Sequence, residues 1–274
     1  MDELNNFLEA HTEMGLIGWV HQAEAARRFG ITVHQAERAI LEMGLLPARY
    51  QRNCGTASVE GQLVLHGSRV AVIGCGGLGG YVVEQLARLG VGTIVAVDPD
   101  VFEEHNLNRQ LLSSIEGLGA PKAAAAAQRV AAINPAVTVV PVQDAFCPEN
   151  ASVLLAGSRV AVDALDSVQT RLELADACNR LQLPLVHGAI AGWYGQVATQ
   201  LPGHATVRHI YSSWTSGAGV ERELGNPSFT PAAVAGVQTA EVCKLLLGLE
   251  HPLSGRKLLL DLLHMDMDHF TLPA

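Results

Sequence analysis

The chain has 274 residues, of which 49 % are hydrophobic and 16 % charged, so it is long and apolar enough to bury a sizeable core. This composition excludes a disordered or collagen-like protein, and the 27 glycines, which follow no three-residue period, indicate turns and close backbone contacts instead. The formal net charge of −9 argues against a general nucleic-acid-binding or membrane-binding surface, so neither nucleic acid nor membrane is expected as a partner.

The N-terminus and the cysteines both indicate the cytoplasm. Met1, Asp2 and Glu3 do not form the basic head of a signal peptide, and no apolar run approaches the length of a membrane span. The five cysteines are widely spaced and include no CxxC pair, so the sequence predicts neither a disulfide framework nor a cysteine-pair zinc site. We therefore expect a cytoplasmic protein.

Residues 1–48 differ in pattern from the rest of the chain and are expected to form a small helical appendage. Ala23–Phe29 and Val33–Met43 are expected to be helices separated by the turn Gly30–Thr32, and Leu46-Pro47 closes the unit. Such a helix–turn–helix hairpin occurs in DNA-binding proteins, but few Arg or Lys side chains stand on its second helix. A packing or partner-binding appendage is therefore the favoured interpretation, and DNA binding is the alternative.

From residue 69 onward, segments typical of strands and helices alternate. Arg69–Gly74 and Thr93–Asp98 are apolar runs typical of parallel strands that are covered on both faces. This alternation predicts an α/β fold with a doubly wound, Rossmann-like and mostly parallel sheet. The other expected strands are Val137–Val142, Arg159–Asp163 and Pro184–Gly188, and the expected helices are Leu78–Leu89, Ala120–Ile133, Glu149–Leu155 and Val168–Leu181.

The pattern changes after Trp193. Gln196–Leu201 alternates like a strand of a half-exposed sheet, Pro231–Leu247 is expected to be an amphipathic helix, and Lys257–Phe270 alternates again. We therefore expect an antiparallel C-terminal half, which belongs to one domain extending over residues 49–274.

A glycine-rich segment joins the first strand to the helix after it. Residues 74–79 read GCGGLG, which matches the pattern G-x-G-x-x-G. Glycines here permit a tight turn and let backbone N–H groups approach a phosphate at the positive end of the helix. Asp98, at the end of the next strand, can accept hydrogen bonds from ribose hydroxyls. The pattern predicts a nucleotide site, without choosing between NAD and ATP, and its candidate residues are Gly74, Gly76, Gly77, Gly79 and Asp98.

Six further segments share their order and spacing with one enzyme family. Residues 49–52, 98–110, 119–122, 163–167, 184–189 and 195–197 read RYQR, DPDVFEEHNLNRQ, GAPK, DALDS, PLVHGA and GQV. Together they resemble the ThiF/MoeB/HesA adenylyltransferases, bacterial relatives of the ubiquitin-activating enzymes. The resemblance extends over about residues 49–262.

The resemblance implies that Arg109 and Lys122 contact the phosphates of ATP and that Asn106 helps to orient them. In the implied reaction a carboxylate attacks the α-phosphate and pyrophosphate leaves, so catalysis depends on positioning and on cationic stabilisation of phosphate oxygens. Arg109 offers a planar fork to phosphate and Lys122 a compact point charge. Ordinary surface ion pairing is the alternative for both side chains.

The resemblance also implies a metal ligand and a dimer. Asp166 matches an aspartate that binds Mg²⁺, a hard cation suited to carboxylate and phosphate oxygens, and Ser167 belongs to the same nucleotide-site motif. Asp163 could instead cap the strand end. Arg52 matches an arginine that reaches the ATP phosphates of the partner subunit, which implies a homodimer with shared sites. A solvated arginine in a linker is the alternative for Arg52.

The chain departs from many relatives where they carry two CxxC pairs for a structural zinc. The corresponding segments, residues 203–208 and 260–265, contain no cysteine, so no zinc is expected. The loop at residues 212–227, where some relatives place a transfer thiol, also contains none. The resemblance therefore supports an acyl-adenylate but no persulfide or thioester step. Cys147 could substitute for that thiol, although a small buried side chain is the favoured interpretation.

A second possible metal site lies near the C-terminus. His264, Asp266 and Asp268 are expected on one face of the alternating segment, opposite Met265 and Met267. A solvated strand face explains this pattern without a metal and is favoured.

The leading hypothesis is ATP- and Mg²⁺-dependent adenylylation of the C-terminal carboxylate of a ubiquitin-like sulfur carrier of the MoaD or ThiS type. By family analogy, such a reaction serves molybdopterin, thiamin or related sulfur insertion. The same fold could instead adenylylate a peptide or small-molecule carboxylate. An NAD-dependent dehydrogenase would share the glycine-rich turn but would not need Arg109, Lys122 and Asp166. A nucleotide-binding regulator that uses residues 1–48 is a further alternative.

Overall fold

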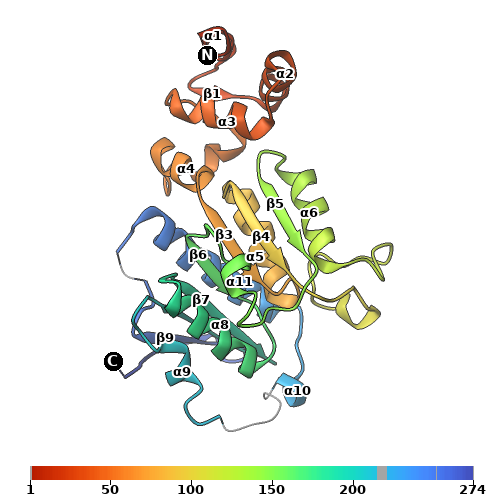
Figure 1. Ribbon diagram of the computed structural model, residues 1–274, viewed down its shortest axis with the longest axis vertical. Helices are drawn as coiled ribbons and strands as arrows, with labels where there is room; N and C mark the ends of the chain where they lie inside the picture. The colour runs from red at the N-terminus through yellow and green to blue at the C-terminus, as the bar shows by residue number, and fades with distance from the viewer. Residues whose placement is uncertain (1, 215–220, 251, 274) are drawn as a thin grey trace.

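A computed structural model describes residues 2–214, 221–250 and 252–273, and an eight-stranded sheet forms the centre of this described part (Figure 1). Its strand order is β10-β9-β8-β7-β6-β3-β4-β5. The strands are β3 (Arg69–Ile73), β4 (Thr93–Val97), β5 (Thr138–Val142), β6 (Val160–Asp163), β7 (Leu185–Ala191), β8 (Tyr194–Gln200), β9 (Arg256–Asp261) and β10 (Asp266–Thr271).

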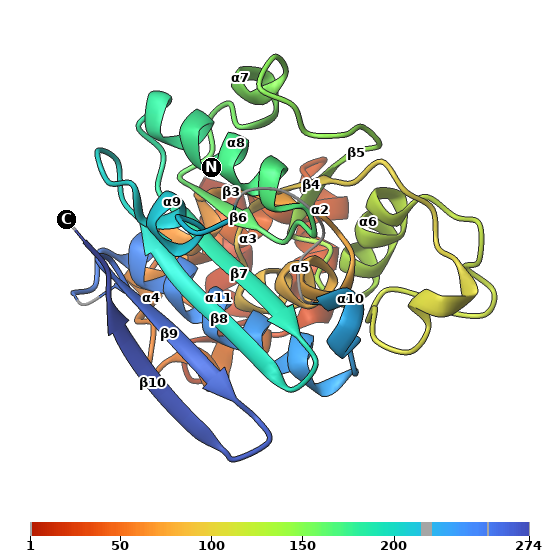
Figure 2. The ribbon, with the colours of Figure 1, turned by 90° about the horizontal axis from the view of Figure 1, so that it is seen from below.

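The sheet has a parallel half and an antiparallel half. Strands β5, β4, β3, β6 and β7 run parallel, whereas β8, β9 and β10 each pair antiparallel with their neighbours. Figure 2 shows the β9–β10 hairpin at the edge of the molecule away from β5. The expected α/β fold, with a mostly parallel sheet and an antiparallel C-terminal half, is confirmed.

Helices cover both faces of the parallel half. The helices on one face are α5 (Gly77–Leu89), α6 (Lys122–Ile133) and α11 (Phe229–Leu247), and those on the other are α7 (Ala151–Leu154), α8 (Val168–Arg180) and α9 (Thr206–Ile210). Val70 and Val72 of β3 belong to the first core, and Ala71 and Ile73 to the second. This double burial is why β3 is a continuous apolar run rather than an alternating one.

The sheet reverses its direction of winding at β3. From there the chain adds β4 and β5 on one side and β6 and β7 on the other. Ile73 pairs with Asp163 across β3 and β6, so the loops that follow these two strands start side by side. In open α/β sheets, ligands bind in the crevice at the carboxyl ends of the strands at such a switch point.

The N-terminal unit has a hydrophobic core of its own. It contains α1 (Asp2–Ala10), β1 (Leu16–Ile17), α2 (Trp19–Phe29), α3 (Val33–Glu42) and β2 (Leu46–Pro47), and its core includes Phe7, Leu8, Ile17 and Ile40. Helix α2 begins four residues earlier than expected, and α1 and the β1–β2 pair were missed. The boundary at residue 48 stays a prediction.

Two segments connect this unit to the sheet, η1 (Ala48–Asn53) and α4 (Val59–His66). In η1, Tyr50 donates a 2.8 Å hydrogen bond to Glu37 and accepts one from Asn134, which follows α6. His34 of α3 contacts the carbonyl oxygen of Ala136, just before β5, at 2.9 Å. The N-terminal unit therefore packs at the amino ends of the strands, at the top of Figure 1, opposite the switch-point crevice.

Two expected elements have different limits for identifiable reasons. Helix α6 begins at Lys122 rather than Ala120, because the residue before a proline is disfavoured in helical conformation and Pro121 itself is extended. The segment Lys257–Phe270 is two strands, because residues 262–265 turn, with Met265 at a φ of +61°. The remaining helices are the short η2 (Glu104–Asn106) and α10 (Glu221–Leu224).

The turn between β9 and β10 shows that the expectation of His264, Asp266 and Asp268 on one strand face is wrong. His264 lies in the turn, and its Nδ1 is 3.0 Å from Oδ2 of Asp261. It therefore does not share a strand face with Asp266 and Asp268.

Within residues 2–214, 221–250 and 252–273, no helix has the length and apolarity that a membrane crossing requires.

Candidate nucleotide-binding and catalytic site

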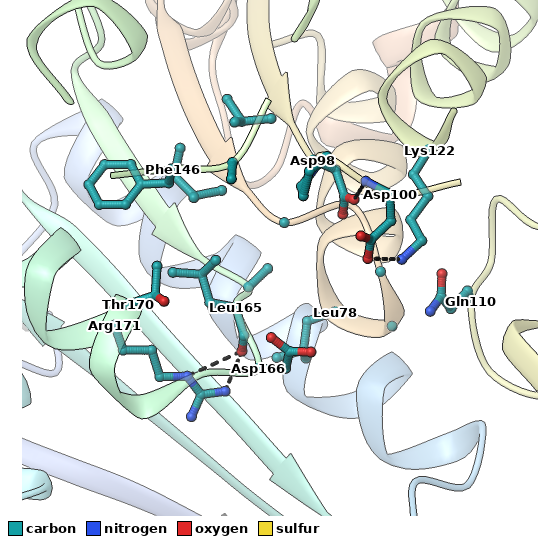
Figure 3. A pocket seen from close by; sticks show the side chains of 18 of the residues that line it. Leu78, Asp98, Asp100, Gln110, Lys122, Phe146, Leu165, Asp166, Thr170 and Arg171 are labelled. Atoms are coloured by element: carbon teal, nitrogen blue, oxygen red, sulfur yellow. Dashed lines mark hydrogen bonds and ion pairs between the residues drawn. The ribbon is translucent and has the colours of Figure 1, made fainter. Parts of the chain in front are cut away.

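A cavity of about 390 Å³ lies at the carboxyl ends of β3, β4 and β6. Its volume lies within the range of about 300–1,000 Å³ typical of ligand pockets. Residues 144–146, which follow β5, line it together with Arg109, Lys122 and Asp166. Figure 3 shows Phe146 and Lys122 on opposite sides of the cavity, with Asp166 between them. The sequence-predicted residues that line it are Gly74, Gly76, Gly77, Asp98, Arg109, Lys122 and Asp166.

The glycine-rich turn requires glycine for steric reasons. Gly74 has a φ of +98°, and a Cβ there would lie 2.5 Å from the carbonyl oxygen of Ala164. A Cβ on Gly79 would lie 1.8 Å from the carbonyl oxygen of Gly74. Gly79 does not line the cavity; its missing side chain lets α5 pack against Gly74 at the end of β3. Gly76 and Gly77 do line it, so the backbone at the N-terminus of α5 is open to an anionic group.

Asp98 ties the glycine-rich turn to β4. Its carboxylate accepts hydrogen bonds from the backbone N–H of Cys75 at 2.7 Å and of Asp100 at 2.9 Å. Burial raises the pKa of Asp98, and these two hydrogen bonds oppose the shift. Because the side chain is 5 % exposed, it shapes the turn as well as lining the cavity.

Lys122 is buried and paired. Its Nζ lies 2.9 Å from Oδ2 of Asp100, whose side chain remains 64 % exposed. Lys122 is the first residue of α6, and only 6 % of it is exposed. A buried ammonium requires a partner, so Asp100 holds this cation in the cavity wall (Figure 3).

Arg109 is held beside the cavity by its own loop. Its NH1 group donates to the carbonyl oxygen of His105 at 3.2 Å and to Oδ1 of Asn108 at 3.0 Å. Burial lowers the pKa of Arg109, and the nearby carboxylate of Asp166 acts in the opposite direction. Arg109 and Asp166 are thus close enough to interact electrostatically across the cavity.

Asn106 lies behind Arg109 and does not line the cavity. It is 3 % exposed, and its side chain accepts from the backbone N–H of Glu103 at 3.0 Å. Its carbonyl oxygen accepts from the backbone N–H groups of Arg109 and Gln110. Asn106 therefore supports the turn on which Arg109 is mounted. Its predicted contact with ATP stays a prediction.

Asp166 and Ser167 lie between β6 and α8. Asp166 is exposed to the cavity, whereas Ser167 caps α8 by accepting a 3.3 Å hydrogen bond from the backbone N–H of Thr170. Asp163, the alternative carboxylate, is fully buried and bonded to His187. Of the two acids, Asp166 is therefore the one that faces the cavity.

Arg52 lies far from its own cavity. A Cβ on Gly90, just after α5, would be 2.5 Å from the hydroxyl oxygen of Tyr50, two residues before Arg52. Helix α5 has 13 residues and begins at Gly77 in the cavity wall, so at about 1.5 Å per residue its ends are about 20 Å apart. Arg52 is exposed and is not among the residues that line the cavity.

The donor set fits a nucleotide and its cation. Open backbone at a helix start, an arginine and a lysine match phosphate oxygens, and the apolar Phe146 also lines the cavity. Mg²⁺ is held in such sites by one or two carboxylates together with substrate phosphates. Asp166 is placed to supply such a carboxylate, with Asp98 and Asp100 in the same cavity.

Several lining residues were missed from the sequence. They are Asp100, Gln110, Asp144, Phe146 and Arg171. Asp144 and Phe146 follow the carboxyl end of a predicted parallel strand, so the switch-point rule could have identified them. Arg171 lies on α8, the helix that follows β6, and its contacts with Leu165 and with the distant Tyr211 follow no pattern in the sequence.

Three of the cysteines are held in the thiol form by burial. Burial raises the pKa of Cys178 to about 12 and that of Cys243 to about 11, and it also raises the pKa of Cys75. Cys147 is half-buried, and its backbone N–H donates to Asn150 at 3.0 Å. Part of the loop at residues 212–227 lies outside the described residues. In the described part of the chain, no group of three or more His, Cys, Asp or Glu side chains could hold a metal ion.

Comparison with known proteins identifies the family. The ThiF family profile matches residues 50–274. A SAMP-activating enzyme E1 from Haloferax volcanii is 40 % identical over 229 residues, which cover 82 % of this chain and 84 % of that protein. A sulfur carrier protein adenylyltransferase from Thermus thermophilus is 37 % identical over 235 residues, which cover 81 % of this chain and 86 % of that protein.

The fold is also found among solved structures. The crystal structure of E. coli MccB with ATP matches with a TM-score of 0.68 at 19 % identity, over 88 % of this chain and 78 % of that one. The sequence resemblance inferred from the six segments is thereby confirmed, and the chain belongs to the ThiF family.

Proposed function

We propose that this protein uses ATP and Mg²⁺ to adenylylate the C-terminal carboxylate of a ubiquitin-like sulfur carrier and releases pyrophosphate. One observation carries the proposal. Arg109, Lys122 and Asp166, from three separate segments, line one cavity with the glycine-rich turn. This arrangement supplies cations and a metal-binding carboxylate at the place where phosphates would lie.

The relatives support both the reaction and the substrate class. One is named an adenylyltransferase of a sulfur carrier protein, and another an activating enzyme E1. A molybdopterin-synthase adenylyltransferase from Salmonella typhimurium is 32 % identical over 204 residues. A carrier of the MoaD type therefore has support in these names. For a ThiS-type carrier, and for thiamin formation, the support is family analogy alone.

The chemistry assigns one task to each side chain. The carrier's carboxylate oxygen forms a bond to the α-phosphorus, and the bond from that phosphorus to the pyrophosphate oxygen breaks. Arg109 and Lys122 stabilise the charge that develops on the phosphate oxygens. Asp166 would hold the cation, which would neutralise phosphate charge and favour departure of pyrophosphate. The N-terminus of α5 binds and orients the phosphate chain.

A homodimer completes the proposal. Arg52 lies on η1, at the end of the sheet away from its own cavity, so it could contact phosphates only in another subunit. We propose that two chains pair about a two-fold axis and that each Arg52 enters the site of the other. A cytoplasmic location and the absence of zinc are part of the same proposal.

The first test separates ATP from NAD. Because the cavity combines the glycine-rich turn with two cations and a carboxylate, we expect calorimetry to show Mg²⁺-dependent binding of ATP and much weaker binding of NAD. Tight NAD binding without ATP binding would instead indicate a dehydrogenase and exclude adenylylation. Nucleotide binding without turnover of any carboxylate substrate would indicate a regulator.

A further inference from the structure

A buried network of polar side chains lies beside Asp166 and has no part in the proposed chemistry. Asp163 and His187 are fully buried, Arg171 is 8 % exposed, and Tyr211 is half-buried. They come from β6, β7, α8 and the end of α9, so folding alone brings them together. Burying three ionisable groups is costly unless they are paired and hydrogen-bonded, so their partners define what this cluster does.

These side chains hydrogen-bond to the backbone of Leu165, directly before Asp166. The backbone N–H of Leu165 donates to Oδ1 of Asp163 at 3.0 Å. The carbonyl oxygen of Leu165 accepts from Nε of Arg171 at 3.2 Å and from its NH2 group (Figure 3). That carbonyl belongs to the planar peptide that joins Leu165 to Asp166. Arg171 thus fixes the orientation from which the Asp166 side chain leaves the backbone.

Arg171 is itself held in position. Its NH1 group donates to the hydroxyl oxygen of Tyr211 at 2.5 Å, and its Nε lies 3.9 Å from Oδ1 of Asp163. The same hydroxyl accepts from Gln196 at 3.2 Å. Burial raises the pKa of Tyr211, so the hydroxyl stays neutral and its oxygen remains an acceptor for the guanidinium.

His187 holds Asp163 in place on the side away from Leu165. Its Nδ1 lies 2.7 Å from Oδ2 of Asp163, and burial lowers its pKa, so the neutral ring donates Nδ1–H to the carboxylate. Its ring packs edge-on against Tyr211, with 5.6 Å between the ring centroids. One oxygen of Asp163 is thus occupied by His187, which leaves the other for Leu165.

We propose that Arg171 and Tyr211 are positioning residues that orient Asp166 toward the Mg²⁺ of the bound nucleotide. This inference rests on the proposed role of Asp166 as the metal ligand. Asp163 and His187 hold one side of the Leu165 backbone and Arg171 the other. Tyr211 fixes the guanidinium, so the loss of one hydroxyl acts on the metal through a chain of two hydrogen bonds.

The test is a double-mutant cycle on metal-dependent binding. Tyr211→Phe removes the hydroxyl but keeps the ring against His187. We expect the gain in ATP affinity that Mg²⁺ produces, measured by calorimetry with and without the metal, to fall about tenfold, as for the loss of a hydrogen bond to a charged group. In an Asp166→Asn background the same change should cause no further loss, because both substitutions act on one interaction. Tyr81→Phe, on α5, is the control and should leave metal dependence unchanged.

Two results would overturn the proposal. One is a Tyr211→Phe protein with wild-type metal dependence, and the other is a loss that adds fully to that of Asp166→Asn. If Tyr211→Phe lowers the melting temperature, Arg171→Lys provides the second variant, since it keeps the charge but not the two contacts with Leu165. Failure of the proposed Mg–ATP site is distinguishable, because then Mg²⁺ would not strengthen ATP binding by the wild-type protein at all. Failure of adenylylation alone would leave Mg²⁺-dependent ATP binding intact and would show as an absence of pyrophosphate release with any carboxylate substrate.

Discussion

Replacing Asp166 with asparagine should reduce adenylate formation by about 10²–10³-fold while leaving the fold intact. Asparagine keeps the shape of the side chain but removes the charge that would hold Mg²⁺ against the phosphates. Asp166 is exposed to the cavity, so its replacement leaves no buried charge without a partner. The measurement is the initial rate of pyrophosphate release, together with thermal unfolding of the same preparation.

The matched control for this variant is Asp176→Asn. Asp176 lies on α8 and pairs with Arg208 on the surface, away from the cavity. Exposed pairs of this kind contribute about 0–1 kcal/mol to stability, so both rate and melting temperature should stay close to wild type. A near-normal rate for Asp166→Asn would show that this carboxylate is structural and that the metal is held elsewhere.

Mixed dimers of two inactive variants should regain activity. In a dimer of one Arg52→Ala chain and one Asp166→Asn chain, the first chain keeps its own Asp166 and receives an intact Arg52 from its partner. The other site loses both residues. One site in two is then complete, and with random pairing about half of the dimers are mixed, so about a quarter of wild-type activity is expected.

Co-expression with two different tags provides the clean form of this experiment, because the mixed dimers can be isolated without waiting for subunit exchange. Isolated mixed dimers should reach about half of wild-type activity. If they stay as inactive as the parent variants, Arg52 does not act across a subunit boundary. Since Arg52 is outside its own cavity, it would then have no part in catalysis.

The sequence predicts the parallel half of the fold well, because strands buried on both faces consist of continuous runs of apolar residues. β3 and β4 are covered on both sides, and their residues form continuous apolar runs. The glycine-rich turn is equally predictable from the sequence, since no side chain fits at Gly74 or Gly79. The limits of elements next to prolines and turns are harder to predict, as the start of α6 at Lys122 illustrates.

The candidate site could be predicted only in part, because its supporting contacts are long-range. Lys122 is identifiable from its motif, but its pairing with Asp100 across 22 positions depends on how α6 meets β4. Arg171 and Tyr211 are 40 positions apart and give no pattern in the sequence. The turn at His264 was missed for another reason, since alternation continues on both sides of it and conceals the break.

The most direct test of the proposed function is exchange of labelled pyrophosphate into ATP in the presence of a panel of purified carboxylates. The panel contains small ubiquitin-like carriers that end in Gly-Gly, the same carriers without the last glycine, and short peptides and small acids. We predict Mg²⁺-dependent exchange that requires an intact carrier and disappears when its terminal glycine is removed. Exchange driven equally well by peptides or small acids, or no exchange with any carrier, would contradict the assignment of a ubiquitin-like sulfur carrier as the substrate.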